Sequence, residues 1–210
     1  MFKEVSTKLH FPKIEEGILE FWQTEDIFQK SVRNRSLDPP FVFLEGPPFA
    51  NAPPGVHHVL ARVMKDAICR YKTMTGHYVQ RKAGWDTHGL PVEYQVEKKL
   101  NIKNKRDLEA YGVKNFIEKC KENVFQYEQD WRKMTERIGF WVDLDDPYIT
   151  LSNNYIESVW WILKQAWEKD LLYQGHKVQP YCSRCGTTLA SHEVAQGYQV
   201  VKDPSIYIKF

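Results

Sequence analysis

The sequence has few cysteines and no long apolar run, and each shortage excludes a class of protein. Four cysteines among 210 residues are too few for a disulfide-stabilised scaffold. A membrane-spanning helix needs about 18 or more consecutive apolar residues, and no such run is present. Residues 1–16 carry scattered charges without an apolar centre, which excludes a secretory signal. We therefore expect a cytoplasmic protein with no membrane partner.

An excess of charge of one sign is also lacking. The 29 Lys and Arg residues nearly balance the 27 Asp and Glu residues, and a formal net charge of +2 does not by itself indicate a polyanionic partner. Hydrophobic residues make up 42% of the chain, which excludes an intrinsically disordered polypeptide. Aromatic residues are plentiful, at 14%, and we expect most of them to pack helices together.

Apolar spacing in the first half of the chain predicts a helical lead-in followed by a strand, a helix and a second strand. Such a unit builds a parallel sheet, whose ligands bind at the carboxyl ends of the strands. The loop 46–58, which joins the first strand to the helix, is therefore expected to lie at a ligand. The predicted elements are a helical segment over 12–32, a break at 38–40, a buried strand over 41–44, a helix with apolar residues from Val59 to Tyr71 that ends near Gly76, and a strand from Tyr78 to Gly84.

The second half of the chain contains a helical region followed by a region of short β-prone pieces. Residues 90–169 have apolar side chains mostly at helical intervals, which predicts a helical insertion after the first sheet unit. Beyond residue 172 short β-prone pieces surround Cys182 and Cys185, and two further pieces at 198–201 and 205–210 predict a β-ribbon. The fold class is therefore predicted to be α/β.

Glycine-rich phosphate-binding patterns are absent from the loop 46–58, which offers histidines instead. His57 and His58 lie at the start of the predicted helix, where free backbone N–H groups and the helix dipole favour an anion. A neutral imidazole adds one further donor to phosphate oxygens. The alternative is a pair of surface histidines at a helix cap.

Two segments of this loop and a third one after the predicted second strand carry a resemblance to a known family. Gly46-Pro47-Pro48-Phe49-Ala50-Asn51 with Pro54-Gly55-Val56-His57-His58 resembles the signature loop of the class I aminoacyl-tRNA synthetases. Gly84-Trp85-Asp86-Thr87-His88-Gly89-Leu90-Pro91-Val92-Glu93 resembles the isoleucine enzymes of that class in particular. The stretches 157–161 and 176–182 are also similar, so the resemblance covers essentially the whole chain.

The resemblance implies the first half of a Rossmann-like parallel-sheet catalytic domain. Residues 1–40 would be a helical lead-in, residues 41–172 the half-domain with its helical insertion, and residues 173–210 a terminal zinc knuckle with a β-ribbon that begins the connection to an editing domain. Such enzymes activate L-isoleucine with ATP, as its Mg²⁺ complex, and transfer the aminoacyl group to tRNA(Ile). The full-length enzyme is expected to be a monomer.

The same resemblance assigns roles to single positions. Pro47 would line the isoleucine side-chain pocket, and Asp86 would accept the substrate ammonium. Gly55, His57 and His58 would bind ATP, with His57 and His58 as the catalytic pair. A carboxylate that accepts from a cation makes a charge-assisted hydrogen bond worth roughly 1.5–3 kcal/mol. The alternative for Asp86 is a plain cap on the following helix.

Two positions, 55 and 57, depart from the family pattern. Family members generally have His-x-Gly-His where this chain has Gly55-Val56-His57-His58, so that the first histidine and the glycine have exchanged places. Only His58 keeps its family counterpart. The exchange resembles a variant of the second, eukaryote-like type of bacterial isoleucine enzymes, which is linked to resistance to the antibiotic mupirocin.

The pair Cys182-Ser183-Arg184-Cys185, followed by Gly186, has the ligand spacing of half a tetrahedral zinc site. Two more ligands are needed, and in the family the second cysteine pair lies beyond an inserted editing domain. The alternative is a thioredoxin-like redox pair, which would need a helix to open directly after Cys182. We predict structural Zn²⁺ at Cys182 and Cys185, with only a half-site in this chain.

The family's second motif, KMSKS, is absent, so we expect the chain alone to be an inactive fragment with part of the ATP and isoleucine pockets. Two alternatives stay open. The chain could come from a leucyl- or valyl-tRNA synthetase, which Thr87 and His88 disfavour. It could also be a non-catalytic tRNA-binding module derived from a synthetase, which the presence of Pro47 and Asp86 disfavours.

Overall fold

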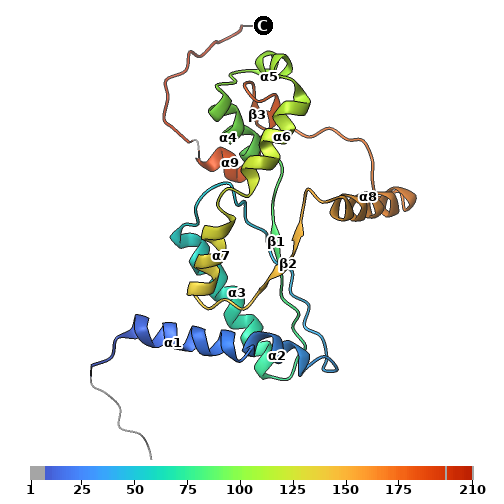
Figure 1. Ribbon diagram of the computed structural model, residues 1–210. Coiled ribbons are helices and arrows are strands. Elements are labelled where there is room, and N and C mark those ends of the chain that lie inside the picture. Colours follow the sequence, from blue (N-terminus) through green and yellow to red (C-terminus); the bar gives the residue numbers. More distant parts are fainter. Residues whose placement is uncertain (1–7, 197, 210) are drawn as a thin grey trace, which may run out of the picture.

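The helical lead-in lies across one end of the molecule (Figure 1). The computed structural model describes residues 8–196 and 198–209, without the side chains of His192 and Gln196. Helix α1 spans Phe11–Thr24 and helix α2 spans Ile27–Arg33. The predicted helical segment is thus confirmed, but it breaks at Asp26, whose φ of 51° is left-handed.

A parallel pair of strands forms the centre, but it is not the pair that the βαβ pattern predicted, because the partner of the strand after the helix comes from residues 143–149 and not from residues 41–44. Strand β1 spans Lys82–Trp85 and strand β2 spans Asp143–Ile149, with Gly84 opposite Tyr148. Helix α3, Val56–Met74, precedes β1 along the chain and begins directly after Gly55. Helix α7, Glu128–Arg137, packs beside the start of α3, because the ring of Trp131 contacts side chains of α3. The α/β class and the parallel sheet are confirmed.

The predicted buried strand over 41–44 is wrong. These residues belong to no strand. The nearest pairings are isolated bridges outside the run, Pro40 to Tyr78 and Phe49 to Asp86, and a backbone hydrogen bond from Phe41 to the Tyr78 carbonyl at 2.9 Å. Without a ladder, Val42 is 76% exposed and Leu44 86% exposed. An apolar run forms a strand only where another backbone can pair with it. The second strand also begins at Lys82 rather than at Tyr78.

The helical insertion is confirmed except at β2, which the sequence pattern missed. Residues 143–147 read Asp-Leu-Asp-Asp-Pro, a composition depleted in strands, and only the pairing with β1 makes them one. The helices of this region are α4 Leu90–Leu100, α5 Lys105–Tyr111, α6 Val113–Val124, α7 and α8 Asn153–Glu168.

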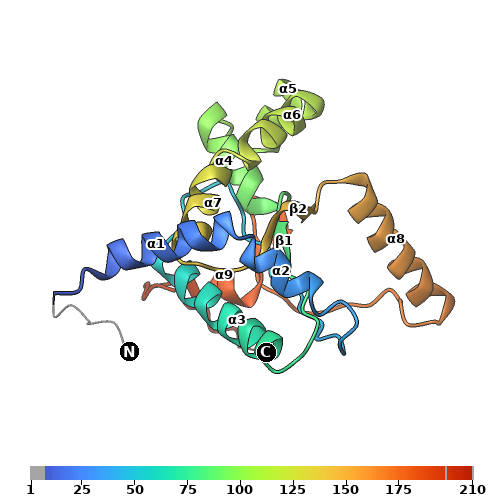
Figure 2. The ribbon, with the colours of Figure 1, turned by 60° about the horizontal axis from the view of Figure 1, so that its bottom comes forward.

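Helix α8 projects from the body in both views (Figures 1 and 2). Its large side chains are largely exposed, with Trp160 at 67%, Trp161 at 62% and Trp167 at 66%. Despite this apolar surface, none of the helices in the described part of the chain has the length and apolarity that crossing a bilayer demands.

The predicted terminal β-ribbon is wrong within residues 198–209, which contain no strand, and Phe210 lies outside the described residues. Val200 is fully exposed, so no neighbouring backbone is available to pair with this segment. The β structure of this region is a hairpin of β3 Tyr181–Cys182 and β4 Thr187–Thr188, followed by helix α9 Ser191–Gln196.

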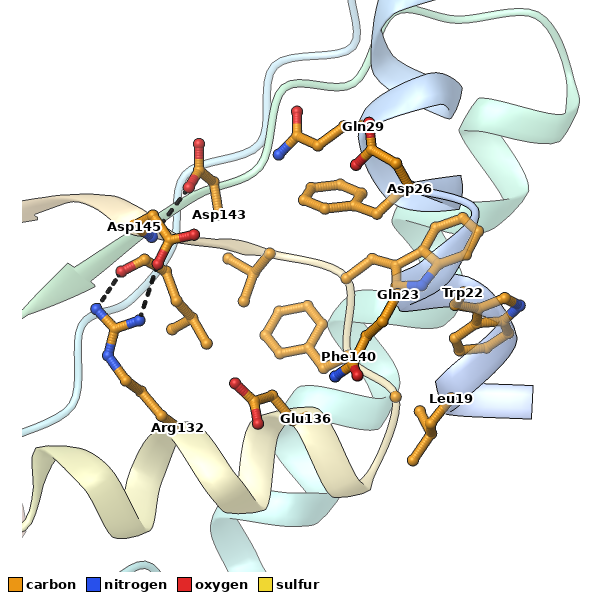
Figure 3. A pocket seen from close by; sticks show the side chains of 15 residues that line it. Leu19, Trp22, Gln23, Asp26, Gln29, Arg132, Glu136, Phe140, Asp143 and Asp145 are labelled. Atoms are coloured by element: carbon orange, nitrogen blue, oxygen red, sulfur yellow. Dashed lines mark hydrogen bonds and ion pairs between the residues drawn. The ribbon is translucent and has the colours of Figure 1, made fainter. Parts of the chain in front are cut away.

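Cation–π contacts of Arg70 with two tryptophan rings connect the helical lead-in to helix α3 and to the segment before β2. The guanidinium of Arg70, on α3, lies 3.8 Å from the ring centroid of Trp141 and 4.7 Å from that of Trp22, on α1. Beside this stack a pocket of about 290 Å³ separates α1 and α2 from segment 139–145 (Figure 3). Arg132 crosses one side of it to Asp145, at 3.2 Å. None of the predicted site residues lines this pocket.

Replacement of Gly84 by alanine is expected to destabilise the fold. A Cβ at position 84 would overlap the phenol ring of Tyr148. The ring cannot turn aside freely, because its hydroxyl donates to the Glu45 carbonyl at 2.5 Å. Overpacking of this kind costs about 1–3 kcal/mol in the free energy of unfolding, measured by urea denaturation.

The matched control is Gly17→Ala on α1, where a Cβ meets no atom within 4 Å. Alanine is favoured over glycine inside a helix by about 0.8–1 kcal/mol, so this variant should be as stable as the parent or more stable. Equal effects of the two substitutions would contradict the packing of Tyr148 on Gly84.

Candidate functional site

The loop 46–58 lies at the carboxyl end of β1, where the βαβ pattern predicted it. The backbone N–H of Asp86, the residue after β1, donates to the carbonyl of Pro48 at 2.9 Å, and Phe49 bridges Asp86 in parallel. Pro47 is half-buried one residue before this contact. Two predicted isoleucine-binding residues, Pro47 and Asp86, are therefore brought to neighbouring backbone positions from 39 residues apart in the sequence.

The rest of the loop is fastened to two helices. The side chain of Asn51 donates to Pro91 at 3.3 Å, and that of Gln95, on α4, donates to the Asn51 carbonyl at 2.8 Å. From α7, the indole N–H of Trp131 donates to the Ala52 carbonyl at 2.8 Å. These bonds satisfy loop backbone groups and fix the path of the loop towards α3.

The two histidines stand together at the first turn of α3. Their ring centroids are 3.8 Å apart. The backbone N–H of Gly55, the N-cap residue, donates to Nδ1 of His58 at 2.9 Å. His57 is exposed and His58 half-buried. One histidine therefore caps the helix, as the alternative interpretation proposed, while the other is open to solvent at the positive end of the helix dipole.

A side chain at position 55 would crowd the ring of His57. A Cβ at position 55 would lie 3.0 Å from Cε1 and 3.1 Å from Nδ1 of the His57 ring, so the ring would have to shift by a few tenths of an ångström. The backbone at Gly55 is extended, with φ of −108°, which any residue adopts. The preference for glycine here therefore comes from the ring of His57 and not from the backbone conformation.

A layer of charged and aromatic side chains that the sequence analysis did not single out lies behind the histidines. The ring of His58 is 4.6 Å from that of Trp131, and the guanidinium of Arg62 is 4.8 Å from the same indole. Glu45, whose side chain is 3% exposed, pairs with Lys65 at 2.6 Å. The helical spacing of His58 and Arg62 could have placed both on one face, but nothing in the sequence indicates Trp131 as their neighbour.

The surroundings of His58 disfavour its charged form. Burial, then the neighbouring His57, then the positive Arg62 lower the pKa of the His58 imidazole below its usual value. A neutral imidazole at this place can donate one hydrogen bond and accept another. His58 is therefore suited to binding an anion through a donor and not through charge.

Asp86 combines burial with an open hydrogen-bonding position. Its Oδ1 is buried and has no hydrogen-bond partner among the described residues. His88 Nδ1 lies 3.9 Å away, but that nitrogen is bonded to the Thr150 hydroxyl at 2.8 Å. Helix α4 is capped by Gly89, so the alternative in which Asp86 caps the helix is wrong. A buried acceptor without a donor is suited to a cationic ligand.

Two apolar cavities flank His88 at this end of the strands. One, of about 520 Å³, lies between His88 and helix α8, and the other, of about 400 Å³, lies between His88 and helix α6. Thr87 and Thr150 join the two strand ends through a hydroxyl–hydroxyl contact of 3.0 Å and so fix the wall between them. Neither Pro47 nor Asp86 lines these cavities.

The cysteine pair forms a tight knuckle, residues 182–186, beside α4. The backbone N–H of Cys185 donates to Sγ of Cys182 at 3.4 Å, and Gly186 takes a φ of 71° that favours glycine. The backbone hydrogen bond lowers the pKa of the Cys182 thiol, which favours the thiolate that a metal needs. Strand β4 and not a helix follows, which disfavours the redox alternative.

The knuckle has the donors of a half-site. Among the described residues no group of three or more His, Cys, Asp or Glu side chains is placed to hold a metal ion. Arg184 pairs with Glu97 of α4 at 3.1 Å, which holds the knuckle against the helical insertion.

Comparison with known proteins identifies this arrangement. The family model described as tRNA synthetases class I (I, L, M and V) matches residues 17–208. The chain therefore belongs to the class I tRNA synthetases of this group.

Proteins with similar sequences show which members of this group the chain resembles most clearly. The chain is 56% identical over its whole length to the isoleucine–tRNA ligase of Dehalococcoides mccartyi strain 195, and 57% identical to that of Thermus thermophilus. These alignments cover 21% and 20% of those proteins, so the chain spans about a fifth of the length of the curated relatives.

A solved structure shares the fold. The LeuRS of Agrobacterium radiobacter K84, in a ternary complex with tRNA and LeuAMS, matches with a TM-score of 0.54 and 20% sequence identity. The match covers 86% of this chain and 20% of that one. At this identity the likeness concerns the fold alone.

Proposed function

We propose that the chain is the amino-terminal part of the catalytic domain of an isoleucine–tRNA ligase. The observation that carries the proposal is the buried, unpartnered Oδ1 of Asp86, held beside the Pro47 segment at the carboxyl end of β1. Relatives that are 53–57% identical over the chain bear this name. The substrates are L-isoleucine, ATP and tRNA(Ile), and the reaction takes place in the cytoplasm on a monomeric enzyme.

On the amino-acid side, Asp86 accepts a hydrogen bond from the isoleucine ammonium. The backbone bond from Asp86 to Pro48 sets the carboxylate beside Pro47, which contacts the aliphatic side chain. Burial strengthens the ion pair, because the effective dielectric constant is lower than in water. The amino acid is thereby oriented with its carboxylate free to react.

On the nucleotide side, the first turn of α3 binds the phosphates of the Mg²⁺ complex of ATP. Gly55, His57 and His58 line this turn, and free N–H groups and the imidazoles donate to phosphate oxygens. An isoleucine carboxylate oxygen attacks the α-phosphorus and forms a new P–O bond. The bond to the bridging oxygen breaks, and pyrophosphate leaves with its electron pair. A ribose hydroxyl of tRNA then attacks the acyl carbon and releases AMP.

Two other functions remain as alternatives. A leucyl- or valyl-tRNA synthetase would share the fold, and a non-catalytic tRNA-binding module would share the sequence family. Amino-acid-dependent exchange of pyrophosphate into ATP separates all three.

The expected result is exchange that depends on isoleucine, in the protein encoded by the complete reading frame that contains these residues. Asp86→Ala should lower kcat/KM for isoleucine on the order of 10²–10³-fold, because a buried charge loses its partner, while the KM for ATP changes little.

The control is Asp146→Ala on the neighbouring strand, where a 77% exposed carboxylate pairs with Lys82. This variant should retain exchange. Equal losses for isoleucine and ATP in Asp86→Ala would contradict the assigned role, and leucine- or valine-dependent exchange would identify the alternative enzymes.

We further propose that Cys182 and Cys185 provide two of four ligands to a structural zinc ion. The intact protein should contain about one zinc per chain, and Cys182→Ser with Cys185→Ser should abolish it, as measured by elemental analysis. Residues 1–210 alone should bind zinc weakly, because two thiolates do not complete a tetrahedral site. Cys69→Ser, at a buried thiol remote from the knuckle, is the control. Full zinc content in the double variant would rule out the site.

The exchanged motif is proposed to cause resistance to mupirocin. His57 supplies the phosphate donor that the usual first histidine supplies, and its ring occupies space that a glycine at that position leaves open. Gly55→His combined with His57→Gly should retain isoleucine activation and become more sensitive to the inhibitor. Gly55→His alone forces the two rings apart and should be less active than the double variant. An unchanged sensitivity of the double variant would exclude the motif as the cause.

A further inference from the structure

His58 is held by contacts on two sides. On one side its Nδ1 accepts the backbone N–H of Gly55 at 2.9 Å. On another side its ring lies 4.6 Å, centroid to centroid, from the indole of Trp131, with 58° between the planes. One contact fixes a ring atom and the other fixes the plane, so together they leave the imidazole little rotational freedom.

The bond from Gly55 determines where the proton of His58 lies. A backbone N–H can only donate, so Nδ1 must be the unprotonated acceptor. In the neutral ring the single proton is then on Nε2. Nε2 has no hydrogen bond to the described residues and is not among the buried unpaired atoms, so it is accessible as a donor.

Trp131 is itself rigidly placed. It is 2% exposed and shares a core cluster with Ala50 and Trp85. Its indole N–H is bound to the Ala52 carbonyl at 2.8 Å, which locks the ring to the loop 46–58. The guanidinium of Arg62, one helical turn after His58, lies over the same indole. A side chain fixed at both its body and its polar edge is suited to orienting a neighbour.

We propose that Trp131 is a positioning residue, whose indole together with the Gly55 amide holds the His58 imidazole in the Nε2–H tautomer, with that hydrogen presented to an anionic ligand at the start of α3. The identity of the ligand as an ATP phosphate depends on the proposed function. The tautomer and its dependence on Trp131 do not.

The groups around the ring of His58 also favour its neutral form, because they lower its pKa. His57 and Arg62, both on α3, face His58, and Glu45 compensates Arg62 from the preceding segment. Because the pKa of His58 is lowered in the fold, the unfolded chain takes up a proton first as the pH falls. The contribution of His58 to the free energy of unfolding is therefore lost as the pH drops from its unfolded pKa, about 6.5, to its lower folded pKa. Outside this window the contribution of His58 does not change with pH.

The test is nitrogen NMR of the protein encoded by the complete reading frame, labelled with ¹⁵N-histidine, with His58 assigned by comparison with His58→Gln. In the parent protein near neutral pH, the Nε2 resonance of His58 should be that of a protonated nitrogen and the Nδ1 resonance that of an acceptor. A proton on Nδ1 would overturn the proposal without any variant.

Trp131→Leu is expected to release the ring. The two nitrogen resonances should then approach an average of both tautomers, and the pKa of His58 should rise towards its ordinary value of about 6.5. Trp131→Phe keeps an aromatic ring but lacks the indole N–H, and should give an intermediate result if Trp131→Leu does not fold.

Trp85→Phe is the matched control, because it changes a second indole of the same cluster that is also 2% exposed but is not in ring contact with His58. It should lower stability without moving the His58 resonances. If Trp131→Phe leaves those resonances where the parent has them, or if Trp85→Phe moves them equally, Trp131 only supports the fold.

In the complete enzyme, Trp131→Phe should lower kcat for isoleucine-dependent exchange on the order of 10-fold or more, because misplaced donors lose transition-state contacts. The KM for isoleucine should be unchanged. Absence of any exchange in the parent enzyme would refute the proposed function while leaving the NMR result intact, so the two failures are distinguishable.

Discussion

The hydrogen bond from the Trp131 indole to the Ala52 carbonyl is the contact on which the site depends. It joins helix α7 of the helical insertion to the loop 46–58, which lies far from that helix in the sequence. The body of the indole packs against Trp85, the residue before Asp86, and its ring contacts His58. The strand end that carries Asp86 and the helix start that carries His58 are therefore both positioned by one buried side chain.

The strand end and the helix start differ in their electrostatics. At the strand end, Asp86 keeps one buried carboxylate oxygen without a partner, which makes it an acceptor for a cation. At the helix start, burial, then His57, then the positive Arg62 lower the pKa of His58 and so favour its neutral form, which offers an anion a hydrogen-bond donor in place of a charge. A substrate pair of one ammonium and one triphosphate is complementary to this division.

The sequence alone predicted the elements and positions that local periodicity or a motif determines. Helix α3 follows from its apolar spacing, and the position of Asp86 follows from the βαβ rule and from motif resemblance. Strand β2 was missed because its acidic composition disfavours a strand and only its pairing with β1 determines it. The prediction of a strand at 41–44 failed for the opposite reason, since this run has strand composition but its backbone bonds a neighbour only at its start, from Phe41 to Tyr78. Trp131 lies within the predicted helical insertion, and its contact with His58 depends on tertiary packing that no spacing reveals.

The closeness of position 55 to the ring of His57 determines which side chains can share the start of helix α3. A second side chain at position 55 would place a Cβ 3.0 Å from the imidazole, and the ring would have to shift by a few tenths of an ångström. Glycine at position 55 leaves the imidazole where it stands. The turn therefore holds the ring of His57 in place by leaving room for it and not by a hydrogen bond between the two residues.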